Sequence, residues 1–218
     1  MADVVYGRRP VAEAQRGRRD VLRVVTADDA SPDELTRLAG SPDHQGIVAE
    51  VEPYPYADAD ELAAAPDALI VALDQVQDPH NLGAVCRSAE AAGATGVVIP
   101  DRRAVGVTPA VCKASAGAVE HLAVARVRNL ADWLEAAKKR TGLWVYGAAA
   151  EAADPYTSVD LKGPVVLAMG SEGSGLRPRV ESMCDALVSI PLRGRAASLN
   201  VSAAAAILLF EAVRQRDA

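Results

Sequence analysis

A glycine-rich segment, Gly-Ser-Glu-Gly-Ser-Gly at 170–175, is the first candidate for chemistry in this sequence. Its glycines let the backbone approach a ligand closely and offer N–H groups, which favours binding of a nucleotide. The spacing differs from the Gly-x-Gly-x-x-Gly of dinucleotide folds, Pro178 interrupts the helix expected there, and the Gly-Lys-Ser/Thr of a phosphate-binding loop is absent. By itself the segment is equally compatible with a simple glycine turn.

Two further segments place polar side chains beside helical patterns. Asn81 opens an apolar helical pattern as a possible N-cap, and Arg87 lies less than two turns further on. A lone helical arginine of this kind is more often a solvated surface residue than a catalytic one. In the segment 189–200, two arginines lead to Ser198 and Asn200, for which capping of the last helix is the default explanation.

The cysteines and histidines do not indicate a metal site or a nucleophile. Three cysteines and three histidines are scattered along the chain without a Cys-x-x-Cys pair or a neighbouring histidine. Buried free thiols and chemistry without a metal are therefore expected.

Apolar runs bounded by turn residues predict the elements that must position these segments. Such runs, typical of strands buried on both faces, fall at 69–73, 96–100, 143–147, 165–169 and 186–190, and helical patterns lie between them. This alternation predicts an α/β fold with a mostly parallel sheet and helices on both faces. Ligands bind beyond the carboxyl ends of strands in such sheets, so the three segments are expected along one edge.

Composition bounds the class of protein. The chain has 218 residues, half of them hydrophobic, which suffices for one domain and a small appendage. With no apolar stretch of membrane-spanning length and no signal-peptide pattern, we expect a cytoplasmic protein. A net charge of −6 argues against nonspecific duplex binding, but five N-terminal arginines could bind RNA or simply be solvated. They are Arg8, Arg9, Arg16, Arg18 and Arg19.

Three segments together carry a family resemblance. DPHNLGAVCRSAEAAGATGVVIP, VVLAMGSEGSGLRP and SIPLRGRAASLNVSAAAAILLFE closely resemble motifs 1, 2 and 3 of the SpoU (TrmH-like) RNA 2'-O-ribose methyltransferases, in the same order and spacing. This family belongs to the SPOUT superfamily, and the resemblance spans residues 69–216. The chain looks most similar to the group that methylates a guanosine ribose of 23S ribosomal RNA.

The resemblance implies a catalytic domain at 68–218 whose C-terminal segment forms a deep trefoil knot. It also implies a linker at 56–67 and a substrate-binding domain at 1–55 that resembles a shortened L30e-like α/β domain. Knots are rare exceptions among folds, so sequence rules alone would not predict one.

The resemblance further implies S-adenosylmethionine as the cofactor and a homodimer in which the motif 1 arginine acts across the interface. The implied catalytic residues are Asn81, Arg87, Glu172, Ser198 and Asn200, and the implied cofactor-binding residues are Gly147, Gly170, Ile190 and Leu199. A guanidinium stays protonated in proteins, so we interpret Arg87 as a donor to the developing alkoxide or the neighbouring phosphate rather than as a base.

Several alternatives remain open. The substrate could be ribosomal RNA, which the N-terminal extension favours, or transfer RNA, and the chain could be an antibiotic-resistance enzyme that modifies ribosomal RNA. From other classes, it could be a catalytically silent RNA-binding or ribosome-assembly protein, or a nucleotide-dependent oxidoreductase. The full set of five implied catalytic residues opposes the silent protein, and the glycine order opposes the oxidoreductase.

Overall fold

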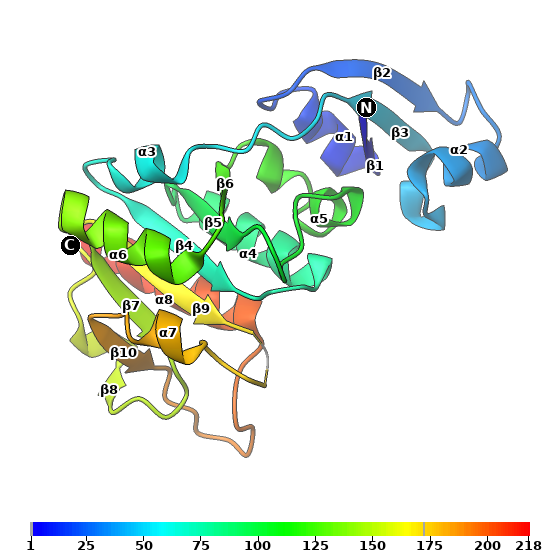
Figure 1. Ribbon diagram of the computed structural model, residues 1–218. Coiled ribbons are helices and arrows are strands. Elements are labelled where there is room, and N and C mark those ends of the chain that lie inside the picture. Colours follow the sequence, from blue (N-terminus) through cyan, green and yellow to red (C-terminus); the bar gives the residue numbers. More distant parts are fainter. Residues whose placement is uncertain (1, 172) are drawn as a thin grey trace.

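The computed structural model describes residues 2–171 and 173–218, and it contains two separate sheets. The larger sheet has seven parallel strands in the order β6-β5-β4-β9-β7-β10-β8, and the smaller one has three strands (Figure 1). The strands of the large sheet are β4 (Leu69–Asp74), β5 (Gly96–Pro100), β6 (Val124–Val127), β7 (Trp144–Ala148), β8 (Asp154–Pro155), β9 (Val165–Gly170) and β10 (Ala186–Ser189).

The central strands are buried on both faces because their residues are apolar without interruption. In β4, Leu69, Val71 and Leu73 pack into one hydrophobic cluster, while Ile70 and Ala72 pack into another on the opposite face. Successive side chains of a strand point to opposite faces, so a continuous apolar run serves two layers at once. This explains why the apolar runs predicted β4, β5, β7, β9 and β10. The short strands β6 and β8, at the edges of the sheet, were not predicted.

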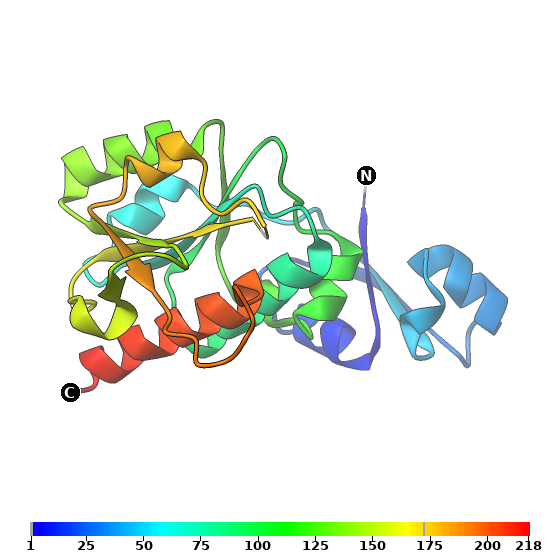
Figure 2. The ribbon, with the colours of Figure 1, turned by 90° about the horizontal axis from the view of Figure 1, so that it is seen from below.

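Helices cover both faces of the large sheet (Figure 2). On one face lie α4 (Pro79–Ala91), α5 (Pro109–Ala114) and α8 (Val201–Arg216), and on the other lie α3 (Ala59–Ala63), α6 (Leu130–Thr141) and α7 (Pro178–Glu181). Asn129 caps α6 by accepting hydrogen bonds from the backbone of residues 131 and 132, and Gly142 ends the helix in the left-handed conformation. The predicted α/β class with a parallel sheet is confirmed.

The small sheet belongs to the N-terminal part of the chain and is antiparallel, with strand order β1-β3-β2. Its strands are β1 (Asp3–Tyr6), β2 (Val21–Thr26) and β3 (Ile47–Val51), and it is accompanied by α1 (Arg8–Ala14), α2 (Pro32–Ala39) and a short 3-10 turn, η1 (Pro42–His44). The sequences VLRVVTA and GIVAEVEPY are typical of strands and correspond to β2 and β3, whereas the four residues of β1 are too few to show a periodicity.

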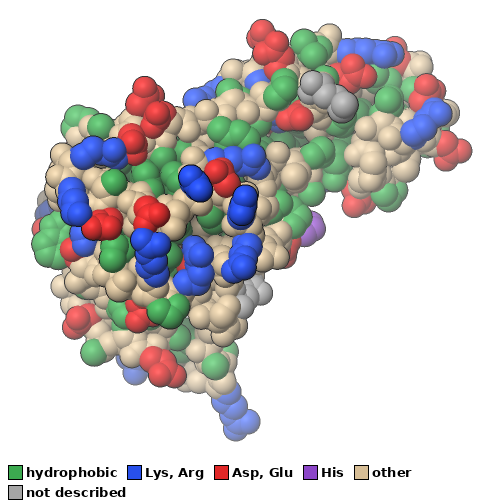
Figure 3. Space-filling view, viewed as in Figure 1, with side chains coloured by type: hydrophobic (Ala, Val, Ile, Leu, Met, Phe, Trp, Pro, Cys, Tyr) green, Lys and Arg blue, Asp and Glu red, His purple; other side chains and the backbone are tan. Residues whose placement is uncertain are grey.

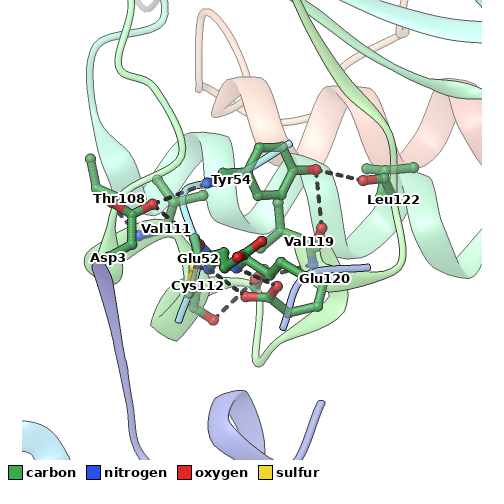
Figure 4. A network of polar contacts seen from close by, with 11 residues as sticks. Asp3, Glu52, Tyr54, Thr108, Val111, Cys112, Val119, Glu120 and Leu122 are labelled. Atoms are coloured by element: carbon green, nitrogen blue, oxygen red, sulfur yellow. Dashed lines mark hydrogen bonds and ion pairs between the residues drawn. The ribbon is translucent and has the colours of Figure 1, made fainter. Parts of the chain in front are cut away.

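The N-terminal unit is joined to the large domain by a buried ion pair. The Arg19 guanidinium donates to both carboxylate oxygens of Glu120, over 2.8 and 2.9 Å, and also to Asp3 and the carbonyl of Glu52. Beside it, the Tyr54 hydroxyl donates to the carbonyls of Val119 and Leu122 (Figure 4). Glu120 lies in η2 (Ala118–Glu120) of the large domain, so this junction fixes the two parts of the chain to each other.

The strand order does not by itself determine how the chain threads, so the trefoil knot stays a prediction. The same holds for the division at 1–55, 56–67 and 68–218 and for the L30e-like character of the first part.

Candidate functional site

A cavity of about 550 Å³ opens at the carboxyl edge of the large sheet. It is lined by the segments after β7 and β9, by the end of β10 and by the start of α8, with apolar side chains including Met169, Leu176 and Ile190. Among its described lining residues, only Glu151 and Glu181 have ionisable side chains. Small-molecule sites are commonly of this size and have mostly apolar walls with a few polar groups. The cavity can therefore enclose an apolar ring system and favours a cation over an anion.

The glycine-rich segment forms one wall of this cavity by folding back on itself. The backbone of Gly175 donates to the carbonyl of Ser171 over 3.0 Å, and the hydroxyls of Ser171 and Ser174 lie 2.8 Å apart. A Cβ on Gly170 would collide with the backbone of Gly175, so only glycine permits this close approach. The segment predicted from its glycines is thus a cavity wall as well as a turn. Glu172, an implied catalytic residue, lies outside the described residues.

An ion pair that the sequence analysis missed holds this segment against the sheet. The fully buried carboxylate of Asp74, at the end of β4, accepts from the Arg177 backbone over 2.9 Å and from the Arg177 guanidinium over 2.8 Å. Asp74 is also the register partner of Gly170 on β9. An acid that ends a wholly apolar strand was the available signal, but its partner lies 103 positions away and only the sheet register identifies it.

Asn81 and Asn200 meet, although they come from the first and third motifs. The side-chain amide of Asn200 donates to the side-chain carbonyl of Asn81 over 2.9 Å. The expectation that Asn81 caps α4 was wrong. Asp78 caps this helix, followed by Pro79 at its first position, which leaves Asn81 inside the first turn. Asn200 does cap α8, and its carbonyl oxygen accepts from the backbone of Ser202 over 2.8 Å.

The remaining implied catalytic residues take different positions. Ser198 lines the cavity close to Asn200 and is exposed. Arg87 is exposed on α4, is not among the residues that line the cavity, and forms no hydrogen bond or ion pair with any described residue. Its guanidinium is thus held by no described group and remains available to a ligand or to another chain.

Three of the four implied cofactor residues line the cavity, namely Gly170, Ile190 and Leu199. Gly147 does not, and its neighbour Ala148 lies there instead. A Cβ on Gly147 would press on the side chains of Leu187, Cys184 and Leu176, which belong to one hydrophobic cluster, and Leu176 also lines the cavity. Gly147 thus makes room for core packing.

The five N-terminal arginines also separate into different environments. Arg19 is withdrawn from the RNA-binding set, because it is only 6% exposed and its guanidinium is committed to the junction with Glu120. Burial lowers the pKa of Arg19, but the hydrogen bonds and charge of Glu120 outweigh it and raise that pKa overall. Arg8 and Arg9 are exposed and line a cleft between α1 and α5 together with Lys113, while Arg16 and Arg18 are exposed on the surface.

The cysteines are free, and burial raises the pKa of each thiol to about 12, which makes them unreactive. Over the described ranges, no group of three or more His, Cys, Asp or Glu side chains could hold a metal ion. In the same ranges, no helix is both long enough and apolar enough to cross a bilayer.

Comparisons with known proteins agree with this geometry. The model of the SpoU rRNA methylase family matches residues 68–210. The putative TrmH family tRNA/rRNA methyltransferase YacO of Bacillus subtilis is 47% identical over 179 residues, which cover 80% of this chain and 72% of YacO. The 23S rRNA (guanosine-2'-O-)-methyltransferase RlmB of Xanthomonas axonopodis is 46% identical, with 94% of this chain and 81% of RlmB covered.

A solved structure is similar over the whole chain. The SpoU methyltransferase AviRb of Streptomyces viridochromogenes, in complex with the cofactor AdoMet, superposes with a TM-score of 0.86 at 29% identity and covers 100% of this chain and 91% of its own. The match of the family model extends over most of the chain and includes all three segments that converge at the cavity. The chain therefore belongs to the SpoU rRNA methylase family.

Proposed function

We propose that this protein transfers a methyl group from S-adenosylmethionine to a ribose 2'-hydroxyl of ribosomal RNA, of the 23S guanosine type. One observation carries the proposal: the amide of Asn200 from the third motif donates to Asn81 from the first, beside a cavity whose wall is the second motif. Residues 119 positions apart meet at that hydrogen bond. The three motifs therefore form one site.

The cavity fits the cofactor in shape and charge. Its apolar wall of Met169, Leu176 and Ile190 suits an adenine ring, and the folded glycine segment presents backbone groups for the ribose and the methionine part. The described ionisable side chains in its wall, Glu151 and Glu181, are acids, which suits a ligand carrying a sulfonium and an ammonium group. We propose that Gly170, Ile190 and Leu199 hold the cofactor, which supplies the methyl group.

The polar residues beside the cavity would orient the ribose and stabilise charge. Methyl transfer needs the attacking oxygen placed in line with the methyl group, and it creates negative charge on that oxygen as its proton leaves. Ser198 and Asn200 would position the ribose, and Asn81 would fix the Asn200 amide. Arg87 would donate to the developing alkoxide or to the adjacent phosphate, since a guanidinium donates but does not take up a proton near neutral pH.

We further propose that the active form is a homodimer in which Arg87 acts in the site of the partner subunit. Support comes from its exposure on α4 and from its position outside the lining of its own cavity. The exposed Phe210 on the neighbouring α8 offers apolar surface for such an interface. Two-fold assembly would place each Arg87 opposite a partner's site.

Ribosomal RNA is favoured over transfer RNA by the extent of the similarity. The RlmB relative, named for 23S ribosomal RNA, aligns with 94% of the chain, so its match reaches into the N-terminal unit. The YacO relative is named as a tRNA/rRNA methyltransferase, so transfer RNA is the second candidate substrate. A ribosomal substrate would place the protein in the cytoplasm.

The test is methyl transfer itself. Unmodified 23S ribosomal RNA and transfer RNA are each incubated with the protein and S-adenosylmethionine labelled in its methyl group, and the nucleosides are then identified by mass spectrometry. We expect one 2'-O-methylated nucleoside in the ribosomal RNA. If only transfer RNA acquires the labelled methyl group, transfer RNA replaces ribosomal RNA as the proposed substrate. Absence of ribose methylation in both RNAs would overturn the proposal.

A further inference from the structure

Four exposed arginines lie at the carboxyl ends of β5 and β6, outside the residues assigned above. Arg102 and Arg103 follow β5, and Arg126 and Arg128 lie on β6 and directly after it. The guanidinium groups of these four residues form no ion pair or hydrogen bond with any described residue, although the backbone of Arg126 takes part in the sheet. We call these four residues the arginine edge. Cations left without a partner carboxylate can bind anions at no cost of breaking an existing pair.

Other arginines of the large domain differ, because they are paired. Arg140 binds Asp60, Arg179 binds Asp132, and Arg177 binds the buried Asp74. Figure 3 shows Lys and Arg side chains gathered around the middle of one face, where Figure 1 draws the ends of β4, β5 and β9. The guanidinium groups of the arginine edge differ from the paired arginines, because no described carboxylate forms an ion pair with them. Asp101 precedes Arg102 in the chain, and Asp58 lines the same cleft as Arg126 and Arg128.

The edge is held in a defined shape. The backbone of Asp101 donates to the carbonyl of Val127 over 2.8 Å, which ties the segment carrying Arg102 and Arg103 to the end of β6. The Arg126 guanidinium stacks on the ring of Tyr56, 4.2 Å from the ring centre, and the Tyr56 hydroxyl accepts from the backbone of residue 107 over 2.8 Å. Stacking orients Arg126 before any ligand arrives and lowers the entropy lost on binding.

The edge also leads to the candidate site. The backbone of Val105 donates over 3.1 Å to the carbonyl of Val76, so the arginine segment lies against the loop that joins β4 to α4, the helix that carries Asn81. Since all strands are parallel, the ends of β5 and β6 lie on the same side of the sheet as the ends of β9, β7 and β10 around the cavity. A chain of phosphates on the arginine edge would continue towards Asn81 and Asn200.

We propose that the arginine edge binds the phosphate backbone of the RNA substrate and directs the target nucleotide to the cavity. This rests on the proposed function and adds a surface of the catalytic domain to the N-terminal arginines. The contacts are to phosphate, so they contribute affinity and position but read no sequence.

The test compares two variants that lose the same charge. In the edge variant, Arg102, Arg103, Arg126 and Arg128 are all changed to Gln. In the control variant, Arg37→Gln, Lys139→Gln, Arg140→Gln and Arg214→Gln remove four cations that are each paired with a carboxylate. Binding to a 20-base-pair RNA duplex of arbitrary sequence is measured by fluorescence anisotropy at several salt concentrations, and S-adenosylhomocysteine binding by calorimetry.

We expect the edge variant to bind the duplex about 10- to 100-fold more weakly, with a salt slope of log K shallower by about 0.9 for each lost phosphate contact, and with unchanged S-adenosylhomocysteine binding. The control should bind within about 2-fold of wild type, since its cations are already neutralised. Its KM for 23S RNA should also stay constant, whereas that of the edge variant should rise with little change in kcat.

Equal duplex binding and equal salt slopes of edge and control variants would overturn the arginine edge while wild-type methyl transfer still upheld the proposed function. Failure of the wild type to bind RNA or methylate it would overturn both. If the fourfold variant does not fold by circular dichroism, Arg102→Gln and Arg128→Gln are measured singly, each with an expected slope change of about 0.9. No change in either slope would then reject the proposal.

Discussion

The junction at Arg19 and the site at Asn81 use similar polar side chains for opposite purposes. At the junction, the guanidinium is 3% exposed and its charge is matched by Glu120, which is fully buried. At the site, Ser198 and Asn200 are exposed. Arg87 is exposed on α4, and its guanidinium pairs with no described residue. A buried ion pair whose hydrogen bonds are all made fixes geometry and has no donor left for a ligand, whereas an exposed guanidinium such as that of Arg87 contributes little to folding and remains available for chemistry.

The difference shows that arginine content near one terminus is not evidence of RNA binding by itself. Arg18 and Arg19 are neighbours in sequence, yet Arg18 is exposed and Arg19 is buried. Their surroundings, rather than their residue type, separate a surface cation from a structural one. The predictions below test this division between residues that hold the fold and residues that serve the reaction.

The largest effect on stability is expected at the junction. Glu120→Ala leaves the Arg19 charge buried without its main partner, which costs about 3–5 kcal/mol of unfolding free energy. Urea unfolding followed by circular dichroism measures this loss. Arg214→Ala, which removes an exposed guanidinium from a pair with Glu211, should cost much less. A loss below about 1 kcal/mol for Glu120→Ala would show that water reaches the junction.

The largest effect on the reaction is expected at Arg87. Arg87→Ala should lower kcat by about 10³-fold because the developing negative charge loses its donor. Stability should change by less than about 0.5 kcal/mol, since the side chain is exposed and makes no described hydrogen bond. Single-turnover methyl transfer and calorimetry with S-adenosylhomocysteine separate the two effects. Unchanged turnover of the Ala variant would contradict the proposed role of Arg87 as a donor to the reacting oxygen. Loss of S-adenosylhomocysteine binding would show instead that Arg87 binds the cofactor.

Asn200 serves both the fold and the site, because its side-chain carbonyl oxygen caps α8 while its side-chain amide donates to Asn81. Asn200→Asp keeps an oxygen for the cap and removes the amide donor, so the melting temperature should hold while kcat falls about 10-fold. Asn200→Ala removes both functions and should also cost about 1 kcal/mol of stability. Full activity of the Asp variant would show that the bond to Asn81 does not matter for turnover.

The smallest effect concerns Glu211 on α8, whose pKa is lowered to about 2 by hydrogen bonds from Arg214 and Gln215. A lowered pKa means that this carboxylate stabilises the fold above its ordinary pKa of 4.5 and ceases to do so as the pH falls towards about 2. Because Arg214 is 65% exposed, the contribution is about 1 kcal/mol.

Unfolding of wild type and Glu211→Gln is compared at several pH values to measure this contribution. The difference should be full at pH 6 and vanish near pH 2. A difference that does not depend on pH would mean that packing, and not the charge, accounts for it.

Much of this protein follows from sequence alone. Continuous apolar runs determined the buried strands, because a strand covered by helices on both faces has no polar side, and glycine at 170 and 175 determined a tight segment. The sequence was ambiguous where two residues were both suited to be the N-cap of the same helix. Asp78 and Pro79 took the cap of α4, although Asn81 was an equally good candidate by residue type.

Tertiary structure alone decided which polar residues meet. Asp74 pairs with Arg177, Arg19 pairs with Glu120, and Asn200 bonds to Asn81, across separations of 103, 101 and 119 positions. Residue type and local spacing determine what a segment can form by itself, but partners at such distances depend on strand order and register. Periodicity does not encode that order, since a parallel sheet is compatible with many arrangements of the same strands.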